Sequence, residues 1–375
     1  MNLNTSAQEA LSINVQGVNK YFSTQAGQVP ALQNINLHIP AGQFVSIIGK
    51  SGSGKSTLIN MLTGIDRPSS GNILVGSTDL HQMKEGQLSV WRGFNMGVVF
   101  QFFQLLPVLT LAENILLPMD LCGKIDPAER EKTACELLDL VGLKDFANKY
   151  PGEVSGGQQQ SAAIARALAN NPPIIMADEP TGNLDSASAE IVFGIFERLV
   201  SEGKTIVMVT HDANLAKRAN RTVILSDGQL VDESIARAFA DLPHPTLLQL
   251  TKAAQRVTFT PGQPIHTPDD NGPAVWVIVS GAAATTSSPS GWHAGEFVSS
   301  TQLHPREVLL AGPEEGAVAL KINTAELPAI VAASPALQSM LTMPGRNHKA
   351  PALPLREAVS DKSSKPQRKR RFLWF

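Results

Sequence analysis

The stretch that decides the fold is Gly49-Lys50-Ser51-Gly52-Ser53-Gly54-Lys55-Ser56-Thr57. It follows the apolar run Phe44 to Ile48 and precedes the apolar run Leu58 to Thr63. The first run is typical of a buried strand and the second of a helix. Between them, the pattern G-x-x-x-x-G-K-[ST] predicts a phosphate-binding loop, because glycines let backbone N–H groups turn toward phosphate oxygens at the positive end of a helix. All nine residues are therefore candidate nucleotide ligands.

Two residues of this loop have specific expected roles. Lys55 reaches the β- and γ-phosphates in such loops, and Ser56 ligates Mg²⁺. The alternative is an ordinary glycine-rich turn between a strand and a helix. The complete motif in its strand and helix context favours the nucleotide site, so ATP and Mg²⁺ are the expected ligands.

A second apolar strand, Ile174 to Ala177, ends in the adjacent carboxylates Asp178 and Glu179. Next to a phosphate loop, Asp178 is expected to hold Mg²⁺ through water. Glu179 is then placed to orient or deprotonate the attacking water. Taken alone, a strand that ends in two acidic residues is more often only a solvated strand end.

The wider pattern predicts an α/β fold with parallel strands, because short Val- and Ile-rich runs alternate with longer helical patterns from Ile13 to about Asp232. Further expected strands are Gly97 to Phe100, Thr205 to Thr210 and Thr222 to Leu225. A mainly helical stretch, Leu111 to Asn171, interrupts this pattern and predicts a helical subdomain.

Composition limits the class of protein. The chain has 375 residues, which suits two or three domains, and its net charge of -2 does not favour a nucleic-acid partner. The two cysteines, Cys122 and Cys135, do not make a disulfide framework and fit a reducing compartment. No run approaches the roughly 20 apolar residues of a membrane span. We expect a cytoplasmic protein whose membrane role depends on a partner.

The motif Val154-Ser155-Gly156-Gly157-Gln158-Gln159 resembles the signature of ABC ATPases, normally L-S-G-G-Q, with Val154 in the Leu place. The other motifs of that family follow in its order and spacing over about Ile13 to Glu233. The resemblance assigns four residues: Tyr21 stacks on adenine, Gln101 belongs to the Q-loop and contacts metal and water, Asp185 belongs to the D-loop, and His211 is the switch histidine that contacts the γ-phosphate.

The resemblance also implies a dimer. In the family, the signature faces the nucleotide held by the other subunit, so Ser155, Gly156, Gly157 and Gln158 would complete the partner's ATP site. A helix that begins at these residues favours anionic phosphate at its N-terminus. One such domain in one chain therefore implies a homodimer around ATP.

The segments Phe102-Phe103-Gln104-Leu105-Leu106-Pro107 and Leu111-Ala112-Glu113-Asn114-Ile115 are most similar to the branch of lipoprotein-release, macrolide-export and cell-division ATPases. In transporters, the segment after Gln101 receives a coupling helix of the permease. The alternative for its aromatics is a place in the helical core. One departure is Ser161, where the branch usually has Arg, which bears on the anchoring of the signature helix.

We therefore expect the ATP-hydrolysing subunit of a transporter that drives a separate membrane permease, at the inner face of the cell membrane. The second hypothesis is that the same ATPase acts on a membrane-associated complex without transport. A soluble DNA-repair or translation ATPase is disfavoured, because the chain has neither a coiled-coil insertion between the phosphate loop and the signature nor a second ABC domain.

The predicted organisation has four parts: a lead-in at 1–12, the ATPase domain at 13–234, a mainly β module at 235–343 and a basic, disordered tail at 344–375. In the module, helical residues Ile235 to Gln255 precede strands at Val257 to Phe259, Ala274 to Val279, Val308 to Ala311 and Ala317 to Ile322. The module resembles a jelly-roll cyclic-nucleotide-binding domain of the cyclic AMP receptor type.

The resemblance implies that Arg306 pairs with a cyclic phosphate and that Glu296 accepts a ribose hydroxyl. Glu307 stands where the family prefers a small residue, and its carboxylate would repel a phosphodiester. A nucleotide sensor and a non-binding regulatory or dimerising module both remain open, and we favour the second. In the tail, basic residues precede Phe372-Leu373-Trp374-Phe375, which predicts contact with an anionic membrane surface or else a solvated tail.

Overall fold

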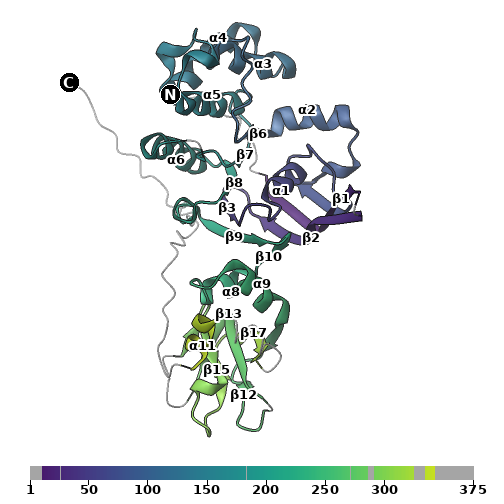
Figure 1. Cartoon of the computed structure of the whole chain (residues 1–375), viewed down its shortest axis with the longest axis vertical. Helices are drawn as coiled ribbons and strands as arrows, with labels where there is room; N and C mark the ends of the chain where they lie inside the picture. Colours follow the sequence, from purple (N-terminus) through teal and green to yellow (C-terminus); the bar gives the residue numbers. More distant parts are fainter. Residues whose placement is uncertain are drawn as a thin grey trace, which may run out of the picture.

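A computed structural model describes residues 11–25, 27–182, 184–270, 272–285, 291–324 and 334–342. The basic tail predicted at 344–375 lies outside these residues. Figure 1 shows a helical lobe that carries α3, α4 and α5, a central lobe of sheets, and a C-terminal module on the other side of the central lobe.

A six-stranded sheet forms the centre of the ATPase region, in the order β10-β9-β3-β8-β7-β6. Its strands are β3 (Phe44–Ile48), β6 (Met96–Val99), β7 (Ile174–Asp178), β8 (Thr205–Thr210), β9 (Arg221–Ser226) and β10 (Gln229–Leu230). All neighbours are parallel except β10, which pairs antiparallel with β9. The predicted parallel strands are confirmed, and β8 is buried along its whole length, as parallel sheets require.

A second, antiparallel sheet packs beside the first, and the prediction of parallel strands from Ile13 onward was wrong for this part. Its order is β2-β1-β4-β5, with β1 (Ile13–Thr24), β2 (Gly27–Ile39), β4 (Ser70–Val75) and β5 (Thr78–Asp79). The hairpin β1–β2 alternates buried and exposed residues, whereas the parallel strands are buried on both faces. The helix α1 (Lys55–Leu62) lies between the two sheets.

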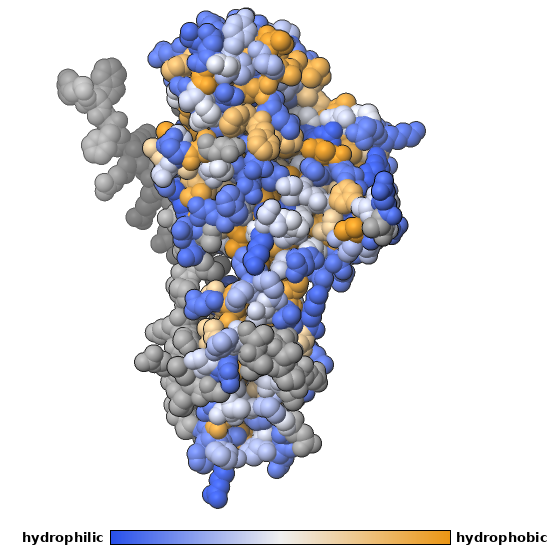
Figure 2. Space-filling model, viewed as in Figure 1, coloured by the Kyte–Doolittle hydropathy of each residue, from blue (hydrophilic) through white to orange (hydrophobic). Residues whose placement is uncertain are grey.

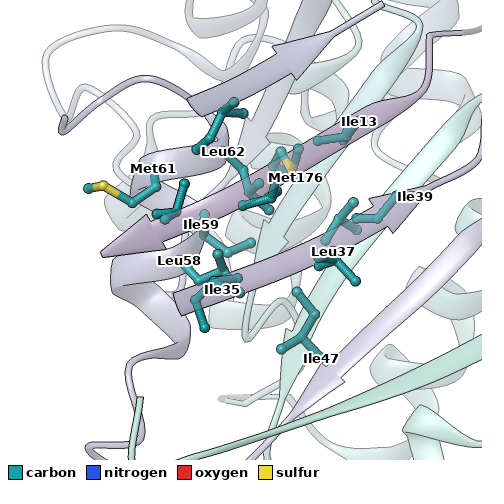
Figure 3. Close-up of a cluster of buried hydrophobic side chains, with 14 of the residues drawn as sticks. Ile13, Ile35, Leu37, Ile39, Ile47, Leu58, Ile59, Met61, Leu62 and Met176 are labelled. Carbon is teal, nitrogen blue, oxygen red and sulfur yellow. The ribbon is translucent and has the colours of Figure 1, made fainter. Parts of the chain in front are cut away.

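The packing of α1 fixes the phosphate loop at its N-terminus. Figure 3 shows Leu58 and Leu62 of this helix among side chains of the hairpin, with Met176 of β7 nearby. Leu58 and Leu62 are fully buried. Because both sheets hold α1, the loop that precedes it cannot shift without disturbing this core.

The helical lobe contains α3 (Leu111–Cys122), α4 (Pro127–Leu140) and α5 (Gly156–Ala167), with the short 3-10 helices η2 (Lys144–Phe146) and η3 (Pro151–Glu153). The predicted helical subdomain is thus confirmed. The helix α2 (Glu85–Asn95) follows η1 (Leu80–Gln82), while α6 (Ser186–Ser201) and α7 (Ala213–Ala216) follow β7 and β8. Three aromatic rings, Phe44, Phe193 and Phe196, pack β3 against α6.

The C-terminal module begins with α8 (Glu233–Ala238) and α9 (His244–Ala253). In the part of the module that the structure describes, the strands are β11 (Ala254–Phe259), β12 (Pro264–His266), β13 (Ala274–Ala284), β14 (Trp292–His293), β15 (Phe297–Ser299), β16 (Leu309–Ala311) and β17 (Ala317–Asn323). The 3-10 helix η4 (Ser300–Gln302) lies between β15 and β16, and α11 (Pro335–Thr342) follows β17. The predicted strands are confirmed. The predicted helical stretch was too long, because Ala254 and Gln255 already pair with β17.

Among the described residues, we find no helix with both the length and the apolar character needed to cross a membrane.

Candidate nucleotide site

The phosphate loop requires its glycines for space and for backbone conformation. A Cβ on Gly49 would lie 2.2 Å from the carbonyl oxygen of Leu225, and a Cβ on Gly54 would lie 2.5 Å from that of Ala31. Gly54 has φ of 100° and is the N-cap of α1, a left-handed conformation that side chains disfavour. The loop is therefore held closely against β9 and β2.

The N-terminus of α1 is available to an anion. No side chain caps it, and its first turn contains no acidic residue. Lys55 is only 6% exposed, and its Nζ donates to the carbonyl oxygens of Gly49 at 2.9 Å and Lys50 at 3.0 Å. The ammonium thus lies within the loop that it is expected to serve, next to helix N–H groups that favour phosphate.

Asp178, at the end of β7, lies beside Ser56 in the loop. Burial is the main cause that raises the pKa of its carboxyl group, while a hydrogen bond from Ser56 opposes the shift. Its Oδ1 is buried and has no hydrogen-bond partner. A buried carboxylate oxygen next to a hydroxyl suits Mg²⁺, which takes one or two protein carboxylates together with phosphate oxygens. The residues present therefore fit the expected ion.

Glu179 is the point where three expected catalytic residues meet. Its Oε2 lies 2.9 Å from Nδ1 of His211 and accepts a hydrogen bond from Nε2 of Gln101 at 3.5 Å. His211 follows β8 and Gln101 follows β6, so three strands of one parallel sheet bring these side chains together. Glu179 also has φ of 46°, which is unusual outside glycine and typical of functional positions.

Tyr21 lies on the hairpin near the same loop. Its ring is part of an exposed surface, with 40% of the residue accessible. It pairs across the hairpin with Pro30, the neighbour of Ala31, whose carbonyl faces Gly54. An accessible aromatic on the strand opposite Pro30 suits the stacking role predicted for it.

The signature residues lie in another lobe. Ser155 is the N-cap of α5 and forms a capping box with Gln158. Figure 1 shows α5 in the helical lobe and α1 in the central lobe. A Cβ on Gly157 would lie 2.9 Å from Oγ of Ser188, whose N–H and hydroxyl both donate to Asp185. The signature and Asp185 are thus neighbours through Ser188.

Asp185 has a clear structural role besides the predicted one. It is the N-cap of α6 and accepts from Ser188 N at 3.0 Å. This hydrogen bond is the main cause that lowers the pKa of its carboxyl group. Its neighbour Asn183 lies outside the described residues.

Two residues that were not among the predicted site residues hold the segment after Gln101. Arg166 of α5 donates to the carbonyl oxygens of Phe103, at 2.9 Å, and Gln104. Both of these residues have positive φ, 51° and 52°, and burial lowers the pKa of the guanidinium. Asn114 is 1% exposed and bonds both the N–H and the carbonyl of Leu106. The contact of Arg166 could not be read from the sequence, because this residue lies 62 positions beyond Gln104.

An apolar surface follows directly after Gln101. Phe102 is 72% exposed, Leu106 42% and Val108 79%, so the alternative that the aromatics of this segment lie in the helical core is wrong for Phe102. Leu105 does pack against that core. Figure 2 shows hydrophobic side chains over the upper lobe and beneath α2. Exposed apolar groups at such density indicate an interaction surface.

The C-terminal residues predicted to bind a cyclic nucleotide lie at the surface or bond to the backbone of their own turns. Arg306 is exposed. Glu296 accepts a hydrogen bond from its near neighbour His293 N at 2.7 Å, and Glu307 accepts one from His304 N at 3.0 Å. An apolar cavity of about 10 Å³ lies elsewhere in the module, lined by residues such as Phe239 and Leu341. That volume is about the space one water needs.

Comparisons with known proteins agree with the geometry of the ATPase region. Residues 32–182 match the family described as ABC transporter. The chain is 47% identical over 219 residues to the uncharacterized ABC transporter ATP-binding protein YvrO of Bacillus subtilis, covering 58% of this chain and 95% of that protein. It is 42% identical over 220 residues to the lipoprotein-releasing system ATP-binding protein LolD of Bacteroides fragilis, covering 58% of this chain and 100% of that protein.

A larger relative and a solved structure give the same picture. The macrolide export ATP-binding/permease protein MacB of Mannheimia succiniciproducens is 43% identical over 254 residues, which is 67% of this chain and 38% of that protein. The dimeric structure of MJ0796, described as a bacterial ABC transporter cassette, superposes with a TM-score of 0.57 at 43% identity. It covers 59% of this chain and 97% of that structure's chain.

The fold and the site define a P-loop ATPase of the ABC type. The chain belongs to the ABC transporter ATP-binding proteins, in the branch of LolD, MacB and MJ0796. It is an ATPase, and its ATPase region covers the N-terminal three-fifths of the chain.

Proposed function

We propose that this protein is the ATP-hydrolysing subunit of a transporter, that it dimerises around ATP, and that it drives a separate membrane permease. The observation that carries the proposal is the meeting of Gln101 and His211 at Glu179, next to the phosphate loop. This arrangement gives a base, its orienting partners and a phosphate site within one region of the sheet.

The side chains divide the chemistry between them. The loop N–H groups and Lys55 bind the phosphates, while Ser56, Asp178 and Gln101 would hold Mg²⁺. Held by these residues, Mg²⁺ would supply positive charge next to the phosphate oxygens. Glu179 accepts the proton of the attacking water at its carboxylate, and His211 and Gln101 orient that carboxylate.

Dimerisation follows from the separation of the two phosphate-recognising elements. Ser155 and the glycines after it begin α5 in the helical lobe, whereas the phosphate loop begins α1 in the central lobe. A second copy, placed head to tail, would bring its signature to this loop. The dimeric structure of the relative MJ0796 supports this arrangement.

The apolar surface at Phe102, Leu106 and Val108 is the proposed permease site. Arg166 of α5 and Asn114 of α3 form hydrogen bonds with this segment. A movement of the segment is therefore passed to both helices. Through this connection, closure of the dimer around ATP would move the permease. Through that partner the protein would lie at the inner face of the membrane, and the predicted basic tail would add contact with anionic lipids.

In the second hypothesis, the same ATPase regulates a membrane-associated complex without transport. The relatives LolD and MacB are described as lipoprotein-releasing and macrolide-export proteins, which favours transport.

The test is to identify the membrane protein that co-purifies with the tagged protein and to measure ATPase activity with that protein in liposomes. A multi-spanning permease that stimulates hydrolysis supports transport, whereas a cell-wall enzyme complex supports the second hypothesis. Val108→Asp should abolish the stimulation and spare basal hydrolysis, because burying a charge at this apolar surface against the permease is unfavourable. Ile191→Asp, at an exposed apolar residue of α6, is the matched control and should keep the stimulation.

A further inference from the structure

The C-terminal module shares a hydrophobic core with the strands that carry the phosphate loop. Ile48, the last residue before the loop, packs in one cluster with Ile224 of β9 and Ala216 of α7. The same cluster contains Leu247 and Leu248 of α9 and continues into the strands of the module. The module is thus packed against β9 and shares a core with Ile48, and Figure 1 shows α8 and α9 between β9 and β13.

A hydrogen-bonded connection runs beside this core. The N–H of Gly228 donates to the carbonyl of Ser53 in the loop at 3.0 Å, and the carbonyl of Gly228 accepts from Gln33 N at 2.8 Å. Four residues later, Asp232 caps α8, the first helix of the module. The turn that contacts the phosphate loop therefore leads directly into the module.

His244 adds a third connection. It is the first residue of α9, and its Nδ1 is buried without a hydrogen-bond partner. Burial lowers the pKa of the imidazole, and the nearby positive charge of Lys50 lowers it further. His244 thus lies near Lys50, the second residue of the phosphate loop, although the two are far apart in sequence.

We propose that the C-terminal module positions the phosphate loop, so that the affinity of the protein for ATP depends on the docking of α9 through His244, Leu247 and Leu248. The site described above needs a loop that is already shaped before nucleotide arrives. Docking would act through the shared core, in which Ile48 of β3 and Ile224 of β9 join the buried residues of α9. Pre-organisation of this kind strengthens binding, since less order has to be created when the ligand arrives.

This role is independent of which membrane protein the ATPase drives. It concerns only ATP binding to the isolated protein. Failure of the permease assignment would leave it intact, and its own failure would leave the permease assignment intact.

The experiment measures KM for ATP and kcat on full-length variants. His244→Ala and Leu248→Ala should raise KM by about fivefold or more, the lower range of coupling between two sites, and leave kcat at saturating ATP unchanged. His244→Gln, which keeps a polar group of similar reach, should restore part of the affinity. A purely structural role for α9 would instead reduce the active fraction and lower kcat without changing KM.

Two matched controls lie in the same module. His293 is an exposed histidine, and Leu309 is fully buried in the other core of the module, which does not include Ile48. His293→Ala and Leu309→Ala should keep the wild-type KM. The proposal is overturned if His244→Ala and Leu248→Ala keep the wild-type KM, or if Leu309→Ala raises it equally. Should Leu248→Ala fail to fold, the comparison of His244→Ala with His293→Ala decides alone.

Discussion

Two regions of this chain each contain a basic residue that the sequence assigns to a phosphate, and the structure treats them differently. Lys55 is buried within its loop, between two carbonyl oxygens and near Asp178. Arg306 is exposed on a turn, while Glu296 and Glu307 accept hydrogen bonds from the backbone of their own turns. A charge becomes a phosphate site when the fold surrounds it with donors and excludes water, because exposed charges interact weakly.

The regions also differ in how their residues are assembled. In the ATPase region, three parallel strands end at the same edge, so residues far apart in sequence meet at Glu179. In the module, short antiparallel strands are closed by local turns, and the acidic residues satisfy the N–H groups of those turns. The first arrangement leaves polar atoms such as Asp178 Oδ1 free for a ligand.

The largest expected effect that separates the regions is at Glu179. Glu179→Gln should slow hydrolysis by about 10²- to 10⁴-fold, because an amide cannot accept the proton of the attacking water. ATP binding should persist, and the variant should accumulate as an ATP-bound dimer on size-exclusion chromatography. Glu202→Gln, on the surface and paired with Arg198, is the control. Wild-type turnover of Glu179→Gln would remove this residue from the base role.

Lys55→Ala tests the other half of the site. Loss of a charged hydrogen-bond donor costs about 1.5 to 3 kcal/mol, so nucleotide affinity should fall about 10-fold or more. Isothermal titration calorimetry with ATP measures it directly. Lys132→Ala, at an exposed lysine of α4 paired with Glu129, should bind like the wild type. Unchanged affinity and turnover in Lys55→Ala would contradict the loop assignment.

Arg166→Ala should have an intermediate effect. Removing the guanidinium leaves the carbonyl oxygens of Phe103 and Gln104 without their donor, at a cost of about 1 to 3 kcal/mol. We expect a lower thermal midpoint and a larger loss of permease-stimulated than of basal ATPase activity. Arg166→Lys should recover only part of it, because an ammonium cannot form the same fork. Equal loss of both activities would mean that Arg166 acts only on stability.

The smallest effect is expected at Arg306. Arg306→Ala should change the stability by no more than about 0.5 kcal/mol, as for other surface substitutions. Calorimetry on the full-length protein should detect no cyclic AMP or GMP binding, with or without the substitution. Binding that Arg306→Ala abolishes would make the module a nucleotide sensor. Glu307→Ala then tests the repulsion argument, since any residual binding should improve when that carboxylate is removed.

Parts of this molecule were predictable because their signals are local. The strands β3 and β8 begin and end at the predicted residues, since buried parallel strands form continuous apolar runs. The antiparallel sheet of β1, β2, β4 and β5 was missed, because its alternating pattern is weaker and its pairing joins segments on either side of the phosphate loop. The end of α9 was misplaced by two residues, where a helical pattern passes into β11 without a glycine or proline.

The sequence by itself determined the chemistry of the ATPase region. The glycines of the loop, the acidic end of β7 and the signature act through local backbone geometry, which a short stretch of residues specifies. Only the tertiary structure decided that Gln101 and His211 meet at Glu179, that Arg166 holds the segment after Gln101, and that α9 shares a core with β9 and Ile48. These contacts depend on which strands are neighbours in the sheet, and strand order is set by the packing of the whole core.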